Sequence, residues 1–430
     1  MDGYAAYARH ANPGLGRFLE LSGRDVRFVR GHDTVLEDAD GVAWDDWVAG
    51  FGSLNLGHNP PAIKAALADH LAGDAPSLFV ESLNPFAGEL AARLIALAGE
   101  CFETCFLSNS GAEAVEAAIK TALLATGRPR IAYAEGGYHG TTLGALACMA
   151  RGPYRADLDG VLPPFREVPF GDAGALDLVL AAGDVAAFLV EPIQMEAGAR
   201  IANTAYLAAA RAACRRHGAL LIFDEVQTGL GRTGTLFAWQ ASGVEPDVLV
   251  SAKALGGGLV PIGATLVRRG LWERAYPGYL RAEIHNSTFG GNALACRAAL
   301  ATLDVIADPA FLDGVRRRGE TLFCGLRAAL AGAAPVERVS GRGLLGGVKL
   351  RATAHPWVAW ENLGLDELAG YPTAGALVVE RLARRHILAQ VCAHDWSVVR
   401  VEPPLTVDDA TCARFVDALR DAVRWLEQHG

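Results

Sequence analysis

The chain has no long apolar run and no long basic run, and each absence excludes a class of function. None of its apolar stretches approaches the roughly 20 residues of a membrane-spanning helix, although 51% of its 430 residues are hydrophobic. Its longest basic run is Arg316–Arg318, and the formal net charge is −9. An acidic chain without a basic patch is unsuited to general nucleic-acid binding. We therefore expect a globular protein that has neither a membrane nor a nucleic acid as its partner.

The sequence also lacks the marks of secretion, disulfide bonding and metal binding. Its first residues, MDGYAAYARHANPG, contain neither the charged n-region nor the apolar h-region of a signal peptide. Cys101 and Cys105 are too isolated from other potential ligands to indicate zinc, so we expect no metal site. Scattered cysteines in apolar surroundings are typical of reduced core residues in a cytoplasmic protein, and this is the location that we expect. The eight cysteines are at positions 101, 105, 148, 214, 296, 324, 392 and 412.

From about residue 100, short apolar runs alternate with helix-like stretches. This alternation predicts βαβ units and an α/β fold with a doubly wound, mainly parallel sheet flanked by helices. No G-x-G-x-x-G follows the first of these strands, which argues against a nicotinamide dehydrogenase. The apolar runs are TCFLSNS, RIAYAEGG, AAFLVEPI, ALLIFDEV, DVLVSAKA and GATLVRR, and the helical stretches between them include 112–125, 141–150 and 206–217.

The last part of the chain has a different pattern, with helical stretches near 309–333 and 373–386 and few strands. We expect a smaller α+β domain over residues 306–430, which the N-terminal segment 1–55 joins. The large domain would then occupy residues 56–305. The stretch TAHPWVAWENLGLDELAGYP, at 353–372, is interpreted as an irregular insertion.

One lysine stands between an apolar strand and three glycines in VLVSAKALGGG, from Val248 to Gly258. Ligands of open α/β sheets bind outside the carboxyl ends of the strands. Lys253 is therefore either an ordinary solvated lysine or an amine kept for chemistry. Glycines that follow it would leave room for a ligand to approach the backbone closely.

Three further motifs follow predicted strands. In SNSGAEAVEAAIK, Ser110 can cap a helix with Glu113 three residues later, and such a helix N-terminus can also bind a phosphate. In EGGYHGTT, Tyr138 and His139 are either ordinary packing residues or a stacking surface for a flat heterocycle. In LLIFDEV, Asp224 ends a buried run, where a carboxylate is costly without a partner such as a protonated ring nitrogen.

A lysine, a phosphate anchor, a stacking aromatic and a strand-end aspartate together describe a site for pyridoxal 5′-phosphate (PLP). The sequence resembles the class III aminotransferases, which are PLP enzymes of fold type I. The likeness extends from LNLGHNPP at 54–61 to RVEPPL at 400–405, and GGGLVPIGAT, TFGGNALAC and RVEPPLT look most like the diamine aminotransferases that act on putrescine. The other matching motifs are SNSGAEAVEAAIK, YHGTTLGAL, VEPIQMEAG and IFDEVQTGLGRTG.

The resemblance implies a role for each matching residue. Lys253 would be the Schiff-base lysine and the base that moves a proton between substrate and cofactor. Asp224 would keep the pyridine nitrogen protonated, Gln227 would face the ring hydroxyl, and Tyr138 would stack on the ring. Thr288 would reach the phosphate of a neighbouring subunit, which implies a homodimer with shared active sites. The other residues expected at the cofactor are Ser110, Gly111, Ala112, His139, Glu191 and Val226.

Departures from the family pattern bear on the substrate. Thr141 stands where many members that use 2-oxoglutarate carry an arginine, so a second carboxylate has no obvious partner unless Arg200 provides one. Arg400 matches the arginine that binds an α-carboxylate, and Glu196 matches the glutamate that pairs with it. Phe51 replaces a tyrosine of the ornithine enzymes.

We therefore expect a ping-pong transaminase that takes the amino group of a terminal amine, such as a diamine or an omega-amino acid. The acceptor would be a keto acid or an aldehyde. Alternatives are an acetylornithine/ornithine-type or specialised-metabolite aminotransferase, a PLP aminomutase or racemase, and a non-enzymatic PLP-binding protein.

Overall fold

The computed structural model describes residues 3–21, 24–352, 360 and 368–429, and most of the predicted insertion at 353–372 lies outside them. Within these ranges, every helix is too short or too polar to span a bilayer. The helices are α1 (Gly3–Ala6), α2 (Pro13–Leu21), α3 (Ala49–Gly52), α4 (Pro61–Ala72), α5 (Pro85–Ala98), α6 (Gly111–Thr126), α7 (Leu143–Ala147), α8 (Ala173–Leu180), α9 (Thr204–His217), α10 (Trp239–Ser242), α11 (Leu271–Ala275), α12 (Ala293–Ile306), α13 (Pro309–Ala329), α14 (Ala374–Ala383) and α15 (Asp409–His429).

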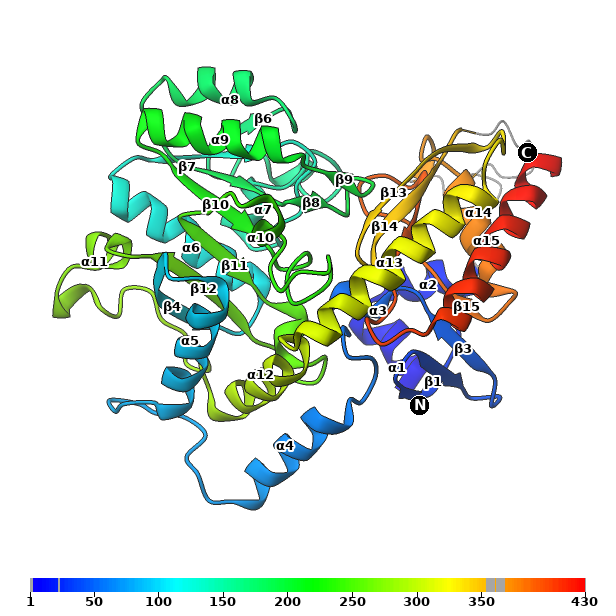
Figure 1. Ribbon diagram of the computed structural model, residues 1–430, viewed down its shortest axis with the longest axis horizontal. Helices are drawn as coiled ribbons and strands as arrows, with labels where there is room; N and C mark the ends of the chain where they lie inside the picture. The colour runs from blue at the N-terminus through cyan, green and yellow to red at the C-terminus, as the bar shows by residue number, and fades with distance from the viewer. Residues whose placement is uncertain (1–2, 22–23, 353–359, 361–367, 430) are drawn as a thin grey trace.

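A seven-stranded sheet forms the centre of the larger part of the molecule (Figure 1). Its order is β4 (Phe102–Ser108), β12 (Gly263–Arg268), β11 (Val248–Ser251), β10 (Leu220–Asp224), β7 (Val185–Val190), β5 (Arg130–Ala134) and β6 (Arg166–Val168). All neighbouring pairs are parallel except those that β12 makes with β11 and β4. The predicted mainly parallel sheet is confirmed.

Helices cover both faces of this sheet, which explains why its strands read as continuous apolar runs. Along β10, Leu221 and Phe223 pack into a cluster with α5, α9 and α12, whereas Leu220 and Ile222 pack on the other face with α6 and α7. Full burial of one such side chain contributes about 1.5–3 kcal/mol to folding. The strand ends are thereby fixed, and the polar residues that follow them are held at one edge.

The C-terminal part contains a three-stranded antiparallel sheet of β13 (Val336–Arg342), β14 (Leu345–Leu350) and β16 (Val398–Val401), against which α13, α14 and α15 pack. The N-terminal strands β1 (Phe28–His32), β2 (Val35–Asp38) and β3 (Ala43–Asp46) form a sheet with β15 (Ile387–Leu388). The Trp47 ring also stacks on Phe415 of α15, with ring centroids 3.6 Å apart. Figure 1 shows these blue N-terminal elements beside the orange and red C-terminal ones. The domain boundaries at 55 and 305 remain a prediction.

Some sequence-based details were wrong. The expected helices 141–150, 309–333 and 373–386 are shorter, at α7, α13 and α14, because their predicted ends continue into turns. The cysteines are all free thiols, but they are not all core residues: Cys324 is exposed on the solvent side of α13, and Cys101 and Cys105 are half-buried. Apolar neighbours in the sequence do not determine which face of an amphipathic helix a cysteine occupies.

Candidate active site

Lys253 lies immediately beyond β11, at the start of a short 3-10 helix, Lys253–Gly256. Its φ of 47° is in the left-handed region, which is uncommon for a residue with a side chain and is often found at functional sites. Lys253 lines a cavity of about 350 Å³ together with Ser110 and Gly111. None of the described residues forms a hydrogen bond or ion pair with its amine. Burial lowers the pKa of Lys253, which favours the neutral amine that can act as a nucleophile or a base.

The three glycines after Lys253 are required in part by protein contacts. Gly257 and Gly258 have φ values of 65° and 74°. A Cβ on Gly257 would lie 2.8 Å from the Thr302 hydroxyl oxygen, and one on Gly258 would lie 2.4 Å from a methyl group of Leu54. Gly258 also lines the cavity of Lys253. The sequence predicted that these glycines leave room for a ligand. The structure adds that Gly257 and Gly258 also leave room for Thr302 and Leu54.

The N-terminus of α6 borders the same cavity. The Ser110 hydroxyl accepts a hydrogen bond from the Glu113 N–H at 3.1 Å, which confirms the predicted cap. The Glu113 carboxylate, however, accepts from the N–H of Asn109 at 2.6 Å rather than from that of Ser110. The N–H groups of Gly111 and Ala112 lie in the first turn, where a helix has no partners of its own for them. This arrangement suits an anion such as phosphate.

Asp224 is the last residue of β10, and it is buried with both of its carboxylate oxygens engaged. One oxygen accepts from the Val226 N–H at 2.9 Å, and the other lies 2.7 Å from His139 Nδ1. His139 thus holds Asp224 in place, and its Nε2 has no partner among the described residues. The next residue, Glu225, instead accepts from the N–H groups of Ala238 and Trp239 and so anchors the loop before α10.

Glu191 follows β7 and lies beside Asp224. Its carboxylate accepts from the Tyr138 N–H at 2.9 Å. Burial, and then the negative charge of Asp224, raise the pKa of Glu191 well above its ordinary value. The protonated form of Glu191 is therefore favoured. The Tyr138 ring packs near Tyr154 and His394, with centroid distances of 6.0 Å and 5.8 Å.

Arg400, on β16, is fully buried and is paired with two carboxylates. Its Nη2 lies 2.6 Å from Glu196, and its Nη1 lies 2.5 Å from Glu402. The Gln227 amide donates to both oxygens of Glu402, at 3.0 Å and 3.1 Å. The guanidinium also lies over the Phe51 ring, 5.0 Å from its centroid. The site thus joins residues from the N-terminal, central and C-terminal parts of the chain.

The pairing of Glu196 with Arg400 outweighs the cost of burying a charge. Burial alone would raise the pKa of Glu196, but the positive charge of Arg400 and its hydrogen bonds lower it to about 2. The pKa of Arg400 is raised correspondingly, since the two nearby carboxylates outweigh its desolvation. Both groups are therefore charged near neutral pH.

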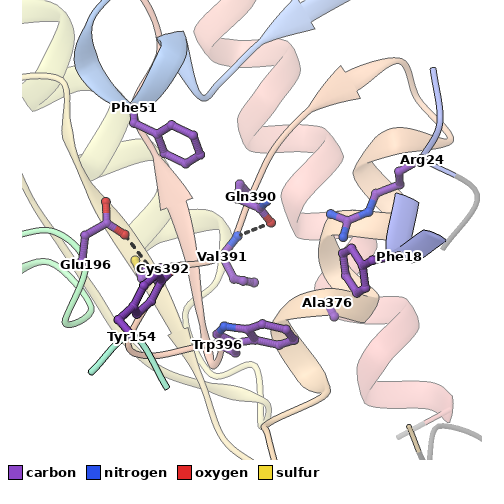
Figure 2. Close-up of a pocket in the computed structure, with 11 residues that line it drawn as sticks. Phe18, Arg24, Phe51, Tyr154, Glu196, Ala376, Gln390, Val391, Cys392 and Trp396 are labelled. Atoms are coloured by element: carbon purple, nitrogen blue, oxygen red, sulfur yellow. Dashed lines mark hydrogen bonds between the residues drawn. The ribbon is translucent and has the colours of Figure 1, made fainter. Parts of the chain in front are cut away.

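Glu196 also faces a second cavity, of about 160 Å³. Figure 2 shows Phe51, Tyr154, Gln390 and Trp396 around this hollow. The Ala393 N–H donates to Glu196 at 2.9 Å. The lining is mixed, with aromatic side chains beside the Glu196 carboxylate and the Arg24 guanidinium, which suits a small organic substrate.

Three other residues lie apart from these cavities. Thr288 is exposed, in the loop before α12. Thr141 is exposed as well. The Arg200 guanidinium lies over the Phe170 ring at 4.7 Å, and its nearest carboxylate is Glu135 at 3.9 Å.

Sequence reasoning did not single out Glu402. It lies two residues after Arg400, and alternate residues of an extended segment lie on the same face. A glutamate in the otherwise largely apolar stretch VVRVEPPL was the feature of the sequence that could have indicated it. Its contact with Gln227 joins residues 175 positions apart, which no local pattern indicates.

The residues around Lys253 fit PLP. They offer an amine that has no partner among the described residues, a helix N-terminus for the phosphate and a buried carboxylate for a protonated ring nitrogen. The chain therefore has a donor set that suits each functional group of this cofactor.

Comparisons with known proteins agree with this fit. A family model described as aminotransferase class-III matches residues 22–423. Aminotransferase PigE of Serratia sp. is 37% identical over 446 aligned positions, which cover 96% of this chain and 52% of PigE, so the chain spans about half the length of that relative.

Solved structures have the same fold. The ornithine aminotransferase of Toxoplasma gondii superposes with a TM-score of 0.83 at 30% identity, covering 94% of this chain and 90% of that one. An amine transaminase from an uncultivated Pseudomonas species, solved in its PLP-bound form, has a TM-score of 0.83 at 27% identity, covering 95% and 96%. The chain belongs to the class III aminotransferases, a PLP-dependent family of fold type I.

Proposed function

We propose that the protein is a PLP-dependent aminotransferase that moves an amino group from a terminal amine to a keto acid or an aldehyde by a ping-pong mechanism. The observation that carries this proposal is the Lys253 amine, which no other described residue pairs with, in a cavity that the N-terminus of α6 also borders. When bound, PLP supplies the electron sink that carries the amino group between the two substrates.

Lys253 holds the cofactor and moves the proton. Its lowered pKa provides a neutral amine at a lower pH than a solvated lysine would allow. Asp224 would pair with the ring nitrogen and keep it protonated, and His139 holds Asp224 in position. Glu191, in its neutral form, fixes the Tyr138 backbone so that the Tyr138 ring can stack on the cofactor.

Ser110, Gly111 and Ala112 at the start of α6 would bind the phosphate, beside Val226, and Gln227 would face the ring hydroxyl. A Cβ on Gly111 would lie 2.9 Å from a Val226 methyl group, so the loop after β10 packs directly against this phosphate site. We assign Thr288 to the phosphate of a neighbouring subunit, which makes the active unit a homodimer. Its exposure on the single chain supports this assignment. A fully active monomer in sedimentation experiments would refute it.

Substrates enter beside Phe51, where Glu196 covers Arg400. When a carboxylate arrives, Glu196 swings into the neighbouring cavity and releases Arg400 to bind it. Donors that have no carboxylate leave the pair closed. Thr141 stands in place of an arginine and Arg200 is packed on Phe170, so neither of these two positions offers a cation to a second carboxylate. This pattern supports diamine or omega-amine donors over dicarboxylates.

A screen of donors and acceptors tests the proposal. The donors are putrescine, cadaverine, ornithine, 4-aminobutyrate, β-alanine and lysine, each with pyruvate, 2-oxoglutarate or an aldehyde. We expect transfer from putrescine or cadaverine, and little advantage of 2-oxoglutarate over pyruvate. Release of no second product, with the amino group moved within one molecule, would instead identify an aminomutase. Preference for ornithine with 2-oxoglutarate would identify the acetylornithine/ornithine type.

A further inference from the structure

Arg400 has more negative charge around it than its proposed task requires. Glu196 contacts its Nη2 at 2.6 Å, and Glu402 contacts its Nη1 at 2.5 Å. The Arg400 and Glu402 side chains are both completely buried, so water screens this pair little. One cation is thus paired with two carboxylates, although a single glutamate is enough to neutralise the charge of a buried arginine when no substrate is bound.

The two carboxylates differ in how firmly they are held. Glu196 borders the cavity of about 160 Å³ beside Phe51, into which it can swing. Glu402 does not line that cavity, and both of its oxygens accept from the Gln227 amide. Gly52 also lies against this carboxylate, since even a Cβ there would lie 2.6 Å from Glu402 Oε1. Among the described residues, Gln227 and Gly52 thus hold Glu402 more firmly than Glu196 is held.

We propose that Glu402 is a fixed counter-charge that weakens the hold of Arg400 on substrate carboxylates and so directs the enzyme toward substrates without them. After Glu196 leaves, Nη1 is still occupied, and the incoming carboxylate meets only Nη2 and Nε of a cation that is already neutralised. The Nε atom has no partner among the described residues, so the Nε and Nη2 side of the guanidinium can donate hydrogen bonds to a carboxylate. Glu402 repels that carboxylate across the guanidinium.

The substrate class that follows is the uncharged aldehyde as acceptor and the alkyl amine or diamine as donor. This inference rests on the proposed function, because it treats Arg400 as the carboxylate anchor of a transaminase. Glu402 acts through Arg400, so it is a positioning residue and not a catalytic one.

The test replaces Glu402 with glutamine, which keeps the shape and an oxygen for Arg400 but removes the charge. In the holoenzyme, Glu402→Gln should lower the KM for pyruvate about tenfold, since a nearby like charge opposes carboxylate binding. The KM for butanal, which has no charge, and kcat with either acceptor should change by less than about threefold. A merely structural role of Glu402 would move both acceptors alike.

Calorimetry with propionate, an unreactive carboxylate, provides a second measurement. Propionate should bind Glu402→Gln about tenfold more tightly than the wild type, and Glu402→Met, which fills a similar volume without charge, should show the same sign. Unchanged or weaker binding in both variants would overturn the proposal. If no donor and acceptor pair reacts, the proposed function fails, but propionate binding still decides the role of Glu402.

Discussion

Asp224 and Glu191 are two buried acids beside the same proposed ring-binding site, yet their hydrogen-bond partners differ. Asp224 is held by His139 Nδ1 and by a backbone N–H. The pKa of Glu191 is raised by burial and by the charge of Asp224, so its neutral form is favoured. In the proposed roles, Asp224 pairs with the ring nitrogen and Glu191 holds the Tyr138 backbone.

Neutral isosteres should therefore affect these acids unequally. Asp224→Asn should lower kcat about 100-fold or more, the scale of losing one preorganised electrostatic group. Glu191→Gln should stay within about fivefold of the wild type, because glutamine resembles the protonated acid. Steady-state kinetics of both purified variants, with equal PLP content, makes the comparison. Equal losses would show that Glu191 works as an anion.

Glu196 should make the protein sensitive to acid. A carboxyl whose pKa falls on folding contributes stability above its unfolded value, here about 4.5, and loses that contribution as the pH falls toward about 2. A depression of this size corresponds to about 3 kcal/mol at most. Urea midpoints of the wild type and Glu196→Gln should differ most above pH 5, and the difference should shrink steadily as the pH falls toward about 2. A constant difference across this range would contradict the assigned pairing.

At the scale of elements, the strand ends explain most of what the sequence predicted correctly. Continuous apolar runs such as Val248–Val250 indicate a sheet covered on both faces, and the polar residue after each run then lies at the ligand-binding edge. The direction of β12 was not predictable, because GATLVRR has the same local pattern as a parallel strand. The Glu113 contact with Asn109 also depends on backbone geometry before the helix rather than on spacing alone.

The glycine loop after Lys253 provides a test at this scale. Gly257→Ala should destabilise the protein by about 1–3 kcal/mol, because alanine is strained at a φ of 65° and its Cβ would meet Thr302 and Ile63. Gly256→Ala is the matched control, since its nearest contact would be 3.4 Å, an ordinary van der Waals distance. Thermal unfolding of the two variants should separate them by several degrees. Equal melting temperatures would refute this account of the loop.

At the scale of the whole molecule, the site forms where distant parts of the chain meet. Phe51 comes from the N-terminal segment, Gln227 follows β10, and Arg400 lies on β16. The Glu196–Arg400 pair joins residues 204 positions apart. Family resemblance indicated that pair, but the contact of Gln227 with Glu402 depends on how the C-terminal sheet packs against the large one. Propensity and periodicity contain no information on such packing.

The central claim is that Lys253 holds PLP for amino-group transfer, and borohydride reduction tests it most directly. The lysines of the chain are Lys64, Lys120, Lys253 and Lys349. Reduction of the holoenzyme, followed by peptide mass spectrometry, should find the phosphopyridoxyl group on Lys253 alone. Incubation with a reactive amine donor before reduction should remove that label, because the cofactor then carries the amino group away from the lysine. A label on any other lysine, or none on Lys253, would contradict the account.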